Sequence, residues 1–377
     1  MQRVLIIGGC GRIGGSIARD ILAHTEDVEV TITGRNPQLG MAALDRLGSK
    51  VQFQVLDLSN PQEVRTAVAK ADLVVHSAGP FHYRDGGVLR ACIEQGVDYT
   101  DVSDERSFTR KALALHPEAE AAGVTAVINT GVFPGISNSM VRQGVEALDE
   151  AESIQLSYIV AGSGGAGVTV MRTTFIGLQR PFEAWLNGAW QPIKPYTERE
   201  TLEFPPPYGR ASVYWYDMPE AITLQQTFPV KSVITKFGVV PDFYNHATWA
   251  MAHWLPPAVL RSPQTVEFLA NVSHSMTDVT DHFSGTGVAM RCDIKGQQEG
   301  RAAHYVSTFA HENAAIATGL GTGSIAELML KGQLKRPGVY PVEQALSSDL
   351  FKDVMASRQL SVHEVVNQAE TASQRLK

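Results

Sequence analysis

The chain contains 377 residues, of which 44% are hydrophobic and 19% charged, a composition that excludes disordered, collagen-like and coiled-coil proteins. Its length predicts two domains, since a domain typically has roughly 100 to 200 residues. The net charge of −7 provides no long-range attraction for nucleic acid or anionic lipid. The three cysteines form no C-x-x-C pair and no signal peptide follows Met1, so we expect a cytoplasmic protein with neither disulfide nor metal.

Short apolar runs alternate with helix-like stretches up to about residue 130. Such alternation predicts right-handed β-α-β crossovers, and hence an α/β fold with a Rossmann-type, doubly wound parallel sheet. The strand-like runs are Val4–Ile7, Val28–Thr33, Val51–Leu56, Leu73–Ser77, Tyr99–Val102 and Thr125–Asn129.

The pattern changes after about residue 131, where strand-like runs are separated by Gly and Pro. Ser153–Val160, Val168–Ile176 and Thr223–Phe228 are such runs, and they predict an α+β second domain. The segment Phe243–Leu260 is apolar, but it is too short and too interrupted to span a membrane. It is either a packed helix or a helix whose tryptophans contact lipid or an apolar substrate.

A glycine-rich loop follows the first strand directly. Gly9, Gly11 and Gly14 fulfil the pattern G-x-G-x-x-G, with Arg12 and Ile13 inside it and a helix behind it. This pattern permits a tight turn and a close backbone approach to a pyrophosphate at the helix N-terminus. We therefore expect these five residues to bind a dinucleotide.

The end of the second strand favours NADP over NAD. An NAD site usually places an acidic residue here to bind the ribose 2′-hydroxyl, whereas an arginine accommodates a 2′-phosphate. The sequence has Arg35 and no acidic residue at this point, and Arg12 adds a second cation. The alternative for Arg35 is an ordinary solvated side chain.

Two further turns lie at the carboxyl edge of the predicted sheet. Asp57 follows the third strand, and Gly79 and Pro80 follow the fourth. In a doubly wound sheet this edge binds the ligand, so Asp57 is expected near the adenosine, and Gly79 and Pro80 near the ribose and nicotinamide. Ordinary turn chemistry explains the same residues equally well.

Several motifs together resemble the saccharopine dehydrogenase-like oxidoreductases. They are the glycine loop, Ala78–Phe81, Cys92–Ser103, Gly131–Asn138, Gly319–Gly323 and Gly338–Glu343. The form Gly-x-x-Pro-Gly-x-Ser-Asn is closest to the lysine dehydrogenase and carboxynorspermidine synthase branches. Phe133 stands where the saccharopine reductase branch has an acidic residue, which makes saccharopine a poor candidate for the substrate.

The resemblance implies a domain division and a reaction. In the family a late helix rejoins the nucleotide domain, so residues 1–131 and 313–345 would form the NADP domain and 132–312 an inserted domain for substrate binding. Residues 346–377 would then form a C-terminal helical tail. The family transfers a hydride between a nicotinamide and its substrate, commonly at a C–N bond, in the cleft between the domains.

Two residues are candidates for the chemistry. Asp101 ends the fifth strand and is expected to exchange the substrate proton, with a structural role at the start of the next helix as an equal alternative. Asp104 and Glu105 fit better as acidic residues at that helix start, which Ser103 caps. Arg172, expected on a strand of the second domain, has the planar fork that binds a carboxylate, although an exposed structural arginine is the alternative.

The sequence thus predicts an NADP(H)-dependent oxidoreductase that acts at a C–N bond of a small amine or imino acid. A reductase of a hydrophobic or lipid substrate, or a nucleotide-binding protein without turnover, remain as alternatives. The expected partner is a small molecule, with no nucleic acid and no membrane span, and the chain acts either alone or as a homodimer.

Overall fold

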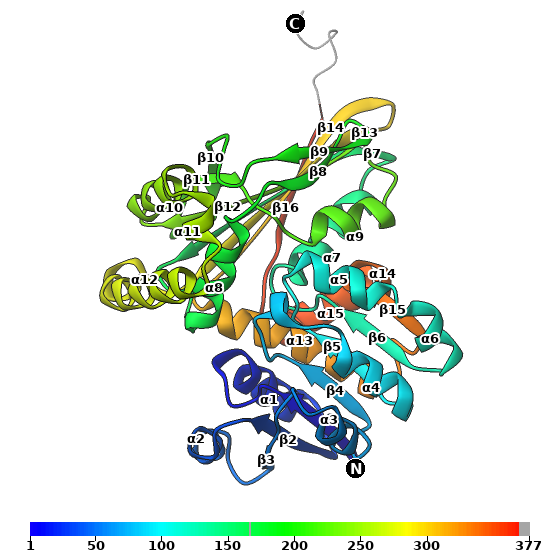
Figure 1. The fold of residues 1–377 in the computed structure, drawn as a ribbon. Helices are drawn as coiled ribbons and strands as arrows, with labels where there is room; N and C mark the ends of the chain where they lie inside the picture. The colour runs from blue at the N-terminus through cyan, green and yellow to red at the C-terminus, as the bar shows by residue number, and fades with distance from the viewer. Residues whose placement is uncertain (166, 369–377) are drawn as a thin grey trace, which may run out of the picture.

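The computed structural model describes residues 1–165 and 167–368. It contains two sheets, one above the other, with helices between and around them (Figure 1). The first sheet is entirely parallel, which confirms the predicted doubly wound fold. In spatial order its strands are β15 (Gly338–Pro341), β6 (Thr125–Ile128), β5 (Asp98–Asp101), β4 (Leu73–His76), β1 (Gln2–Ile7), β2 (Val28–Gly34) and β3 (Val51–Val55).

Helices cover both faces of this sheet, because its strands are apolar on both sides. In β1, Val4 and Ile6 pack into a core cluster with α1, α2 and α13, while Leu5 and Ile7 pack into another with α3 and α4. The helical elements around this sheet are α1 (Arg12–His24), α2 (Pro37–Leu47), α3 (Pro61–Val68), η1 (Phe81–Tyr83), α4 (Gly87–Gln95), α5 (Arg106–Leu113), α6 (His116–Ala121), α7 (Ile136–Glu146), α13 (Ala314–Leu330), α14 (Val342–Ala345) and α15 (Ser348–Ser357).

Helix α13 returns the chain to the first sheet. A Cβ atom on Gly319 would lie 2.4 Å from Cβ of Ser16, and one on Gly323 would lie 2.2 Å from a carboxylate oxygen of Asp20. These glycines therefore let α13 lie directly against α1. The chain then adds β15 beside β6 at the edge of the sheet.

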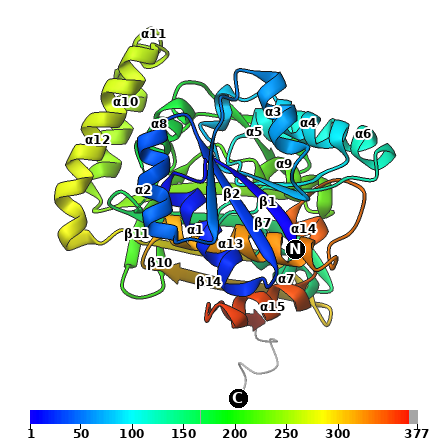
Figure 2. The ribbon, with the colours of Figure 1, turned by 90° about the horizontal axis from the view of Figure 1, so that it is seen from below.

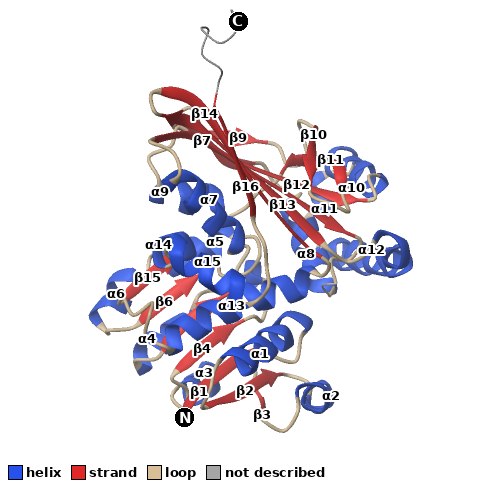
Figure 3. Ribbon diagram, turned by 180° about the vertical axis from the view of Figure 1, so that it is seen from behind, coloured by secondary structure: helices blue, strands red, loops and turns tan. Residues whose placement is uncertain are grey.

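The second sheet is mixed, since β12 pairs parallel with β7 while the other pairs are antiparallel. The predicted α+β second domain is thus confirmed (Figure 3). Its strands are β7 (Glu150–Ala161), β8 (Phe182–Leu186), β9 (Ala189–Ile193), β10 (Glu200–Phe204), β11 (Gly209–Trp215), β12 (Ser232–Val240), β13 (Val288–Gln298), β14 (Arg301–His311) and β16 (His363–Gln368). Its helices are α8 (Val168–Gly177), α9 (Glu220–Thr227), α10 (Phe243–Trp254), α11 (Pro257–Leu260) and α12 (Pro263–Ser284).

Three of the predicted elements differ from the structure. Val168–Ile176 and Thr223–Phe228 were expected as strands, but most of each lies in a helix, α8 and α9. The C-terminal tail is helical only in α15, because His363–Gln368 pairs with β14 as the edge strand β16 of the second sheet. Residues 369–377 of the predicted tail lie outside the described residues. No helix in the described part of the chain is long and apolar enough to cross a membrane.

Candidate active site

The glycine-rich loop joins β1 to α1, and close contacts require its glycines. A Cβ atom on Gly9 would lie 2.6 Å from Cβ of Ile32, and one on Gly14 would lie 2.5 Å from the carbonyl oxygen of Gly8. Gly11 is the N-cap residue of α1, and none of the described side chains caps this helix end. The first N–H groups of α1 and the positive end of its dipole are therefore available to an anion.

Arg12 and Ile13 have different surroundings within this loop. Gly9, Gly11 and Arg12 line a cavity of about 320 Å³, and Nη1 of Arg12 donates to the carbonyl oxygen of Gly165 at 3.2 Å. Ile13 packs against the core of the first domain. The loop therefore meets the second domain through Arg12.

A larger cavity, of about 710 Å³, opens at the carboxyl ends of the strands from β1 to β4. Arg35 is exposed at the end of β2, and Nε of Arg84 donates to the carbonyl oxygen of Ala78 at 3.0 Å. Burial lowers the pKa of the Arg84 guanidinium, and the nearby charge of Arg35 lowers it further. Four arginines line this cavity, of which Arg65 and Arg90 are paired with Glu94 and Glu118. Arg35 and Arg84 are therefore the cationic groups that suit a phosphate there.

Asp57 and Gly79 line the same cavity. The N–H of Ser59 donates to the Asp57 carboxylate at 3.0 Å and, as the largest cause, lowers its pKa. A Cβ atom on Gly79 would lie 3.4 Å from Cγ2 of Thr169, so this turn faces α8 of the second domain. Pro80 directly precedes η1, which leads from this cavity towards the cleft between the domains.

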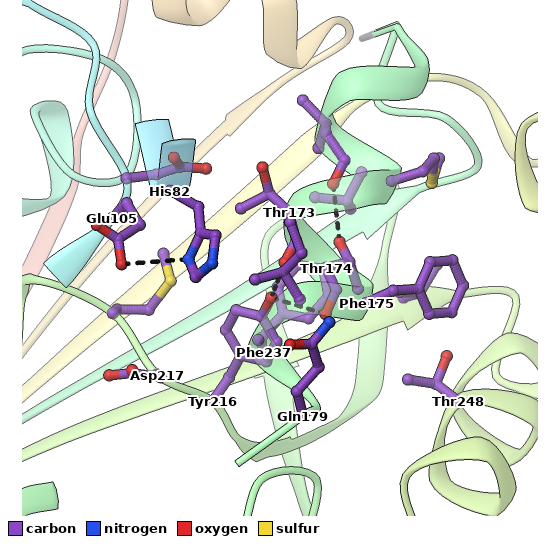
Figure 4. A pocket seen from close by; sticks show the side chains of 18 of the residues that line it. His82, Glu105, Thr173, Thr174, Phe175, Gln179, Tyr216, Asp217, Phe237 and Thr248 are labelled. Atoms are coloured by element: carbon purple, nitrogen blue, oxygen red, sulfur yellow. Dashed lines mark hydrogen bonds and ion pairs between the residues drawn. The ribbon is translucent and has the colours of Figure 1, made fainter. Parts of the chain in front are cut away.

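That cleft contains a cavity of about 500 Å³ (Figure 4). His82 and Glu105 lie on one side of it, and Thr173, Thr174 and Tyr216 on the other. Much of its wall is apolar or aromatic and comes from residues 132–312, whereas the residues that line it from the first domain are polar. The residues of that wall include Phe133, Val160, Val170, Met171, Phe175, Ile176, Phe182, Phe237, Val239 and Tyr244.

Two carboxyl groups in this cavity have pKa values well above the usual range for aspartate. Burial raises the pKa of Asp104 to about 6. Burial also raises the pKa of Asp217 to about 6, although Nη2 of Arg106 lies 2.6 Å from its carboxylate and opposes that rise. A carboxyl group of this kind can act as a general acid or base.

The structure corrects the assignment of the helix cap near Asp104. Glu105 is the N-cap residue of α5, where its carboxylate accepts hydrogen bonds from the N–H of Phe108 at 2.6 Å and the hydroxyl of Ser107 at 2.8 Å. The same carboxylate lies 3.7 Å from His82 Nδ1 (Figure 4). Both Asp104 and Glu105 line the cavity, but the Glu105 carboxylate is engaged in capping α5. Asp104 is therefore the functional candidate of the two, although the sequence favoured a place at the helix start for it.

Asp101 does not reach the cleft, contrary to the prediction. Its side chain is fully buried at the end of β5, and one carboxylate oxygen accepts hydrogen bonds from the N–H groups of Ser103 and Asn129, both at 3.0 Å. These bonds tie the end of β5 to the end of β6. Asp101 therefore joins the ends of β5 and β6 and is not among the residues that line the cavity between the domains.

Arg172 also differs from the prediction, since it lies on helix α8 and not on a strand. Its guanidinium binds the carboxylate of Glu267 on α12 through two hydrogen bonds of 2.6 Å. Its neighbours Met171 and Thr173 line the cavity instead. Arg172 thus binds a carboxylate of the protein itself, that of Glu267, and not one of a substrate.

Two distant sequence motifs meet behind the cleft. Nδ2 of Asn138 donates to Glu343 at 2.9 Å, which joins Gly131–Asn138 to Gly338–Glu343. Close by, the hydroxyl of Tyr158 donates to Glu220, and the ring of Tyr158 stacks on Phe133 at a centroid distance of 4.6 Å. Phe133 therefore packs against Tyr158, which belongs to a buried polar network.

The glycine-rich segment after β7 lies between the cavity of the cleft and the cavity beside the glycine loop, and we call it the lip. The carboxylate of Asp281 accepts hydrogen bonds from the N–H and the hydroxyl of Ser163, at 2.8 and 2.5 Å. Gly162, Gly164 and Gly165 all have positive φ, so other residues would be strained there. The lip, defined here as residues 162–165, is therefore held in place by α12.

Known proteins are similar to this chain in sequence and, for one solved structure, in fold. Residues 4–127 match the family described as Saccharopine dehydrogenase NADP binding domain. A carboxyaminopropylagmatine dehydrogenase of Synechocystis is 23% identical, over 97% of this chain and 98% of its own length. A carboxynorspermidine synthase of Vibrio cholerae is 25% identical, over 93% of this chain and 94% of its own length.

One further relative is similar to only a third of the chain, and one solved structure shares the fold of almost all of it. A trans-acting enoyl reductase of Mycobacterium ulcerans is 26% identical, but over only 34% of this chain and 32% of its own length. The solved apo saccharopine dehydrogenase (L-Glu forming) of Saccharomyces cerevisiae shares the fold, with a TM-score of 0.71 over 97% of this chain and all of its own, at 14% identity.

The fold, the glycine loop and these relatives define an NAD(P)-dependent oxidoreductase. Within that class, residues 4–127 match the NADP-binding domain of saccharopine dehydrogenase, and the chain as a whole is similar to the saccharopine dehydrogenase-like oxidoreductases. The residues present fit this cofactor, because Gly9 and Gly14 leave no room for a Cβ atom and Arg35 and Arg84 are among the arginines that line the neighbouring cavity.

Proposed function

We propose that this oxidoreductase transfers a hydride between NADP(H) and a C–N bond of a small amine or imine that also carries a carboxylate. The observation that carries the proposal is Asp104, a carboxyl group with a pKa near 6 on the wall of the cavity between the domains. The two relatives that match almost the full chain support it, since both names describe carboxylated polyamines.

The cofactor assignments and the domain division belong to the same proposal. Residues 1–131 and 313–345 would bind NADP, and residues 132–312 would supply most of the substrate cavity. We assign the adenosine and its 2′-phosphate to Arg35, Arg84 and Asp57, the pyrophosphate to the loop from Gly9 to Gly14, and the ribose and nicotinamide to Gly79 and Pro80. NADPH, when bound, supplies the hydride.

Side chains of this protein supply the proton and orient the substrate. In the direction of reduction, the Asp104 carboxyl protonates the imine nitrogen, and the resulting iminium carbon accepts the hydride to give the amine. Arg110 and Arg180 line the same cavity from the two domains and are exposed, so we assign the substrate carboxylate to them in place of Arg172. Apolar walls exclude water from the reacting carbon.

The direct test is oxidation of carboxyaminopropylagmatine and carboxynorspermidine with NADP⁺, followed by nicotinamide absorbance. Turnover of either compound is expected, with kcat/KM in Asp104→Asn lower by about 100-fold or more. In the wild type, kcat/KM for oxidation should rise with pH up to about 6, because the ionised Asp104 carboxylate accepts the proton. Glu183→Gln, an exposed carboxylate of the same cavity, is the matched control and should retain the rate.

The apolar wall of the cavity supports a second candidate function, reduction of a hydrophobic substrate. Phe133, Phe175 and Phe237 present aromatic surface there. NADPH oxidation with a medium-chain 2-enoyl thioester, and none with the amines, would favour this second function and overturn the first.

A further inference from the structure

The charged side chains of the cavity between the domains gather at one end of it. They come from the first domain and from residues 180–217. Arg106 joins these two groups, because it lies 2.6 Å from the Asp217 carboxylate and donates to the carbonyl oxygen of Glu183 at 2.7 Å. Asp104 follows the same strand as Arg106 and belongs to this charged end.

The other end of the cavity is built by α8, β12, α10 and α12. None of the described residues that line the cavity from these four elements carries a charge. Figure 4 shows Phe175 of α8 and Thr248 of α10 on this side, opposite His82. Arg172 is the charged residue of α8, but it binds Glu267 of α12 and does not line the cavity. We call this part of the cavity the uncharged end.

Three hydroxyl groups of the uncharged end are already used within the helices. Those of Thr173 and Thr174 donate to carbonyl oxygens one turn earlier in α8, at 3.3 and 3.1 Å. The hydroxyl of Thr277 donates to the carbonyl oxygen of His274 in α12 at 2.9 Å. A substrate chain therefore meets hydrocarbon and aromatic surface there, and the described lining residues offer no carboxylate to neutralise an ammonium.

The helices of the uncharged end are connected to one another. Helices α10 and α12 lie side by side at the edge of the molecule (Figure 2), and the hydroxyls of Tyr244 and Thr280 link them at 3.0 Å. The two hydrogen bonds of 2.6 Å from Arg172 to Glu267 tie α8 to α12. A chain bound between these helices thus exchanges its contact with water for contact with a fixed wall.

We propose that the substrate of this oxidoreductase carries an uncharged hydrocarbon chain on its reacting nitrogen, and that this chain binds at the uncharged end of the cavity. The inference rests on the proposed function, which places the carboxylate and the reacting nitrogen at the charged end beside Asp104. An ammonium at the end of the chain would lose its water without gaining a carboxylate, whereas a methyl group there gains from burial. The favoured substrate class is therefore an N-alkyl amino acid, with a polyamine chain as the less favoured case.

The test compares two substrates that differ only at the end of the chain. Carboxynorspermidine and the analogue in which a methyl group replaces the ammonium of its aminopropyl chain are each oxidised with NADP⁺ by the full chain. The analogue is expected to have a kcat/KM about 100-fold higher, since burial of an unpaired ion is costly. In a series of N-alkyl chains from propyl to hexyl, each further methylene should raise kcat/KM about fourfold until the chain fills the cavity.

A charge placed at the uncharged end should change this preference. Ser273→Asp introduces a carboxylate at a half-buried residue of α12 that lines the cavity. It is expected to raise kcat/KM for carboxynorspermidine and to lower that for the analogue, by about tenfold each. Ser275→Asp adds the same charge at an exposed residue of the same helix that does not line the cavity, and this matched control should keep the wild-type preference.

The outcomes separate this inference from the proposed function. Equal kcat/KM values for the two amines, or an unchanged preference in Ser273→Asp, would overturn the inference alone. A wild-type preference for carboxynorspermidine would also overturn it, and would mean that the aromatic faces of Phe237 and Tyr244 bind the ammonium. No NADPH formation with any of the amines would refute the proposed function, and the inference with it. If Ser273→Asp loses the circular dichroism of the folded chain, the two substrates and the alkyl series decide in the wild type.

Discussion

At the scale of single residues, we expect the choice between NADP and NAD to depend on Arg35 and Arg84. Both face the cavity of about 710 Å³, and their charges lie close enough to influence each other. Charge-assisted hydrogen bonds to a phosphate are worth about 1.5–3 kcal/mol each. Arg35→Asp is therefore expected to shift the ratio of the Kd values for NADPH and NADH by about 100-fold towards NADH, and Arg84→Gln by about tenfold. Fluorescence titration with each nucleotide measures both ratios.

Arg90 offers a matched control in the same cavity, because its guanidinium lies 3.3 Å from Glu118 and is already paired. Arg90→Gln should leave the ratio unchanged. An equal loss of NADPH and NADH binding in Arg84→Gln would instead show that Arg84 positions the shared adenosine and not the 2′-phosphate.

Glu220 is a buried carboxyl group whose ionisation should reduce stability. Burial raises its pKa to about 7. A group whose folded pKa exceeds its unfolded pKa contributes stability at low pH that is lost as the pH rises through the folded value. From pH 5 to 8, the free energy of unfolding of the wild type is expected to fall by about 2 kcal/mol relative to Glu220→Gln, as followed by urea denaturation. A pH-independent difference would show that Glu220 stays ionised or stays neutral throughout.

Residues whose role follows from backbone geometry could be identified from the sequence, whereas those defined by tertiary neighbours could not. Gly9 and Gly14 fall where the motif places them, because the turn itself demands glycine. Asp104 was assigned to a helix start, since two adjacent acidic residues there are equivalent in sequence. Only the fold shows that both residues line the cavity and that Glu105 is the one that caps α5.

At the scale of elements, the first domain was predictable because its strands are apolar on both faces and its helices amphipathic. The errors fall in α8 and α9, whose β-branched residues favour strands locally. Tertiary contacts override this preference, as where Arg172 of α8 binds Glu267 of α12. The strand β16 was missed because its exposed polar sequence carries no alternating pattern.

The lip of residues 162–165 lies between the cavity of the cleft and the glycine loop. Gly162 and Ser163 line the substrate cavity, while the carbonyl oxygen of Gly165 accepts from Arg12 of the glycine loop. Asp281→Ala removes both hydrogen bonds to Ser163 and is expected to raise the KM for substrate and the Kd for NADPH by about tenfold each, which corresponds to about 1.4 kcal/mol. Asp281→Asn retains an acceptor and should be intermediate. Unchanged constants in Asp281→Ala would mean that glycine geometry alone fixes the lip.

At the scale of the whole molecule, the C-terminal part of the chain binds α1, the helix that follows the glycine loop, through a buried ion pair. Arg358, directly after α15, is buried, and its Nη2 lies 2.6 Å from Asp20 of α1 and 2.9 Å from Glu327 of α13. Gly323 leaves the space that the Asp20 carboxylate occupies. Arg358 thus pairs with carboxylates of two helices, α1 and α13, that are far apart in sequence.

Removing that cation leaves a buried carboxylate without its main partner. Arg358→Met is expected to lower the free energy of unfolding by about 3–5 kcal/mol, because breaking one side of a buried ion pair exposes the full desolvation cost of the other. Glu327 keeps Lys331 at 2.5 Å, so Asp20 bears most of the loss. Asp20→Leu combined with Arg358→Met should therefore recover much of the stability in urea denaturation, since an apolar pair of similar volume needs no compensation. If the double variant is as unstable as Arg358→Met, packing of the Arg358 side chain, and not its charge, is what holds the C-terminal part against α1.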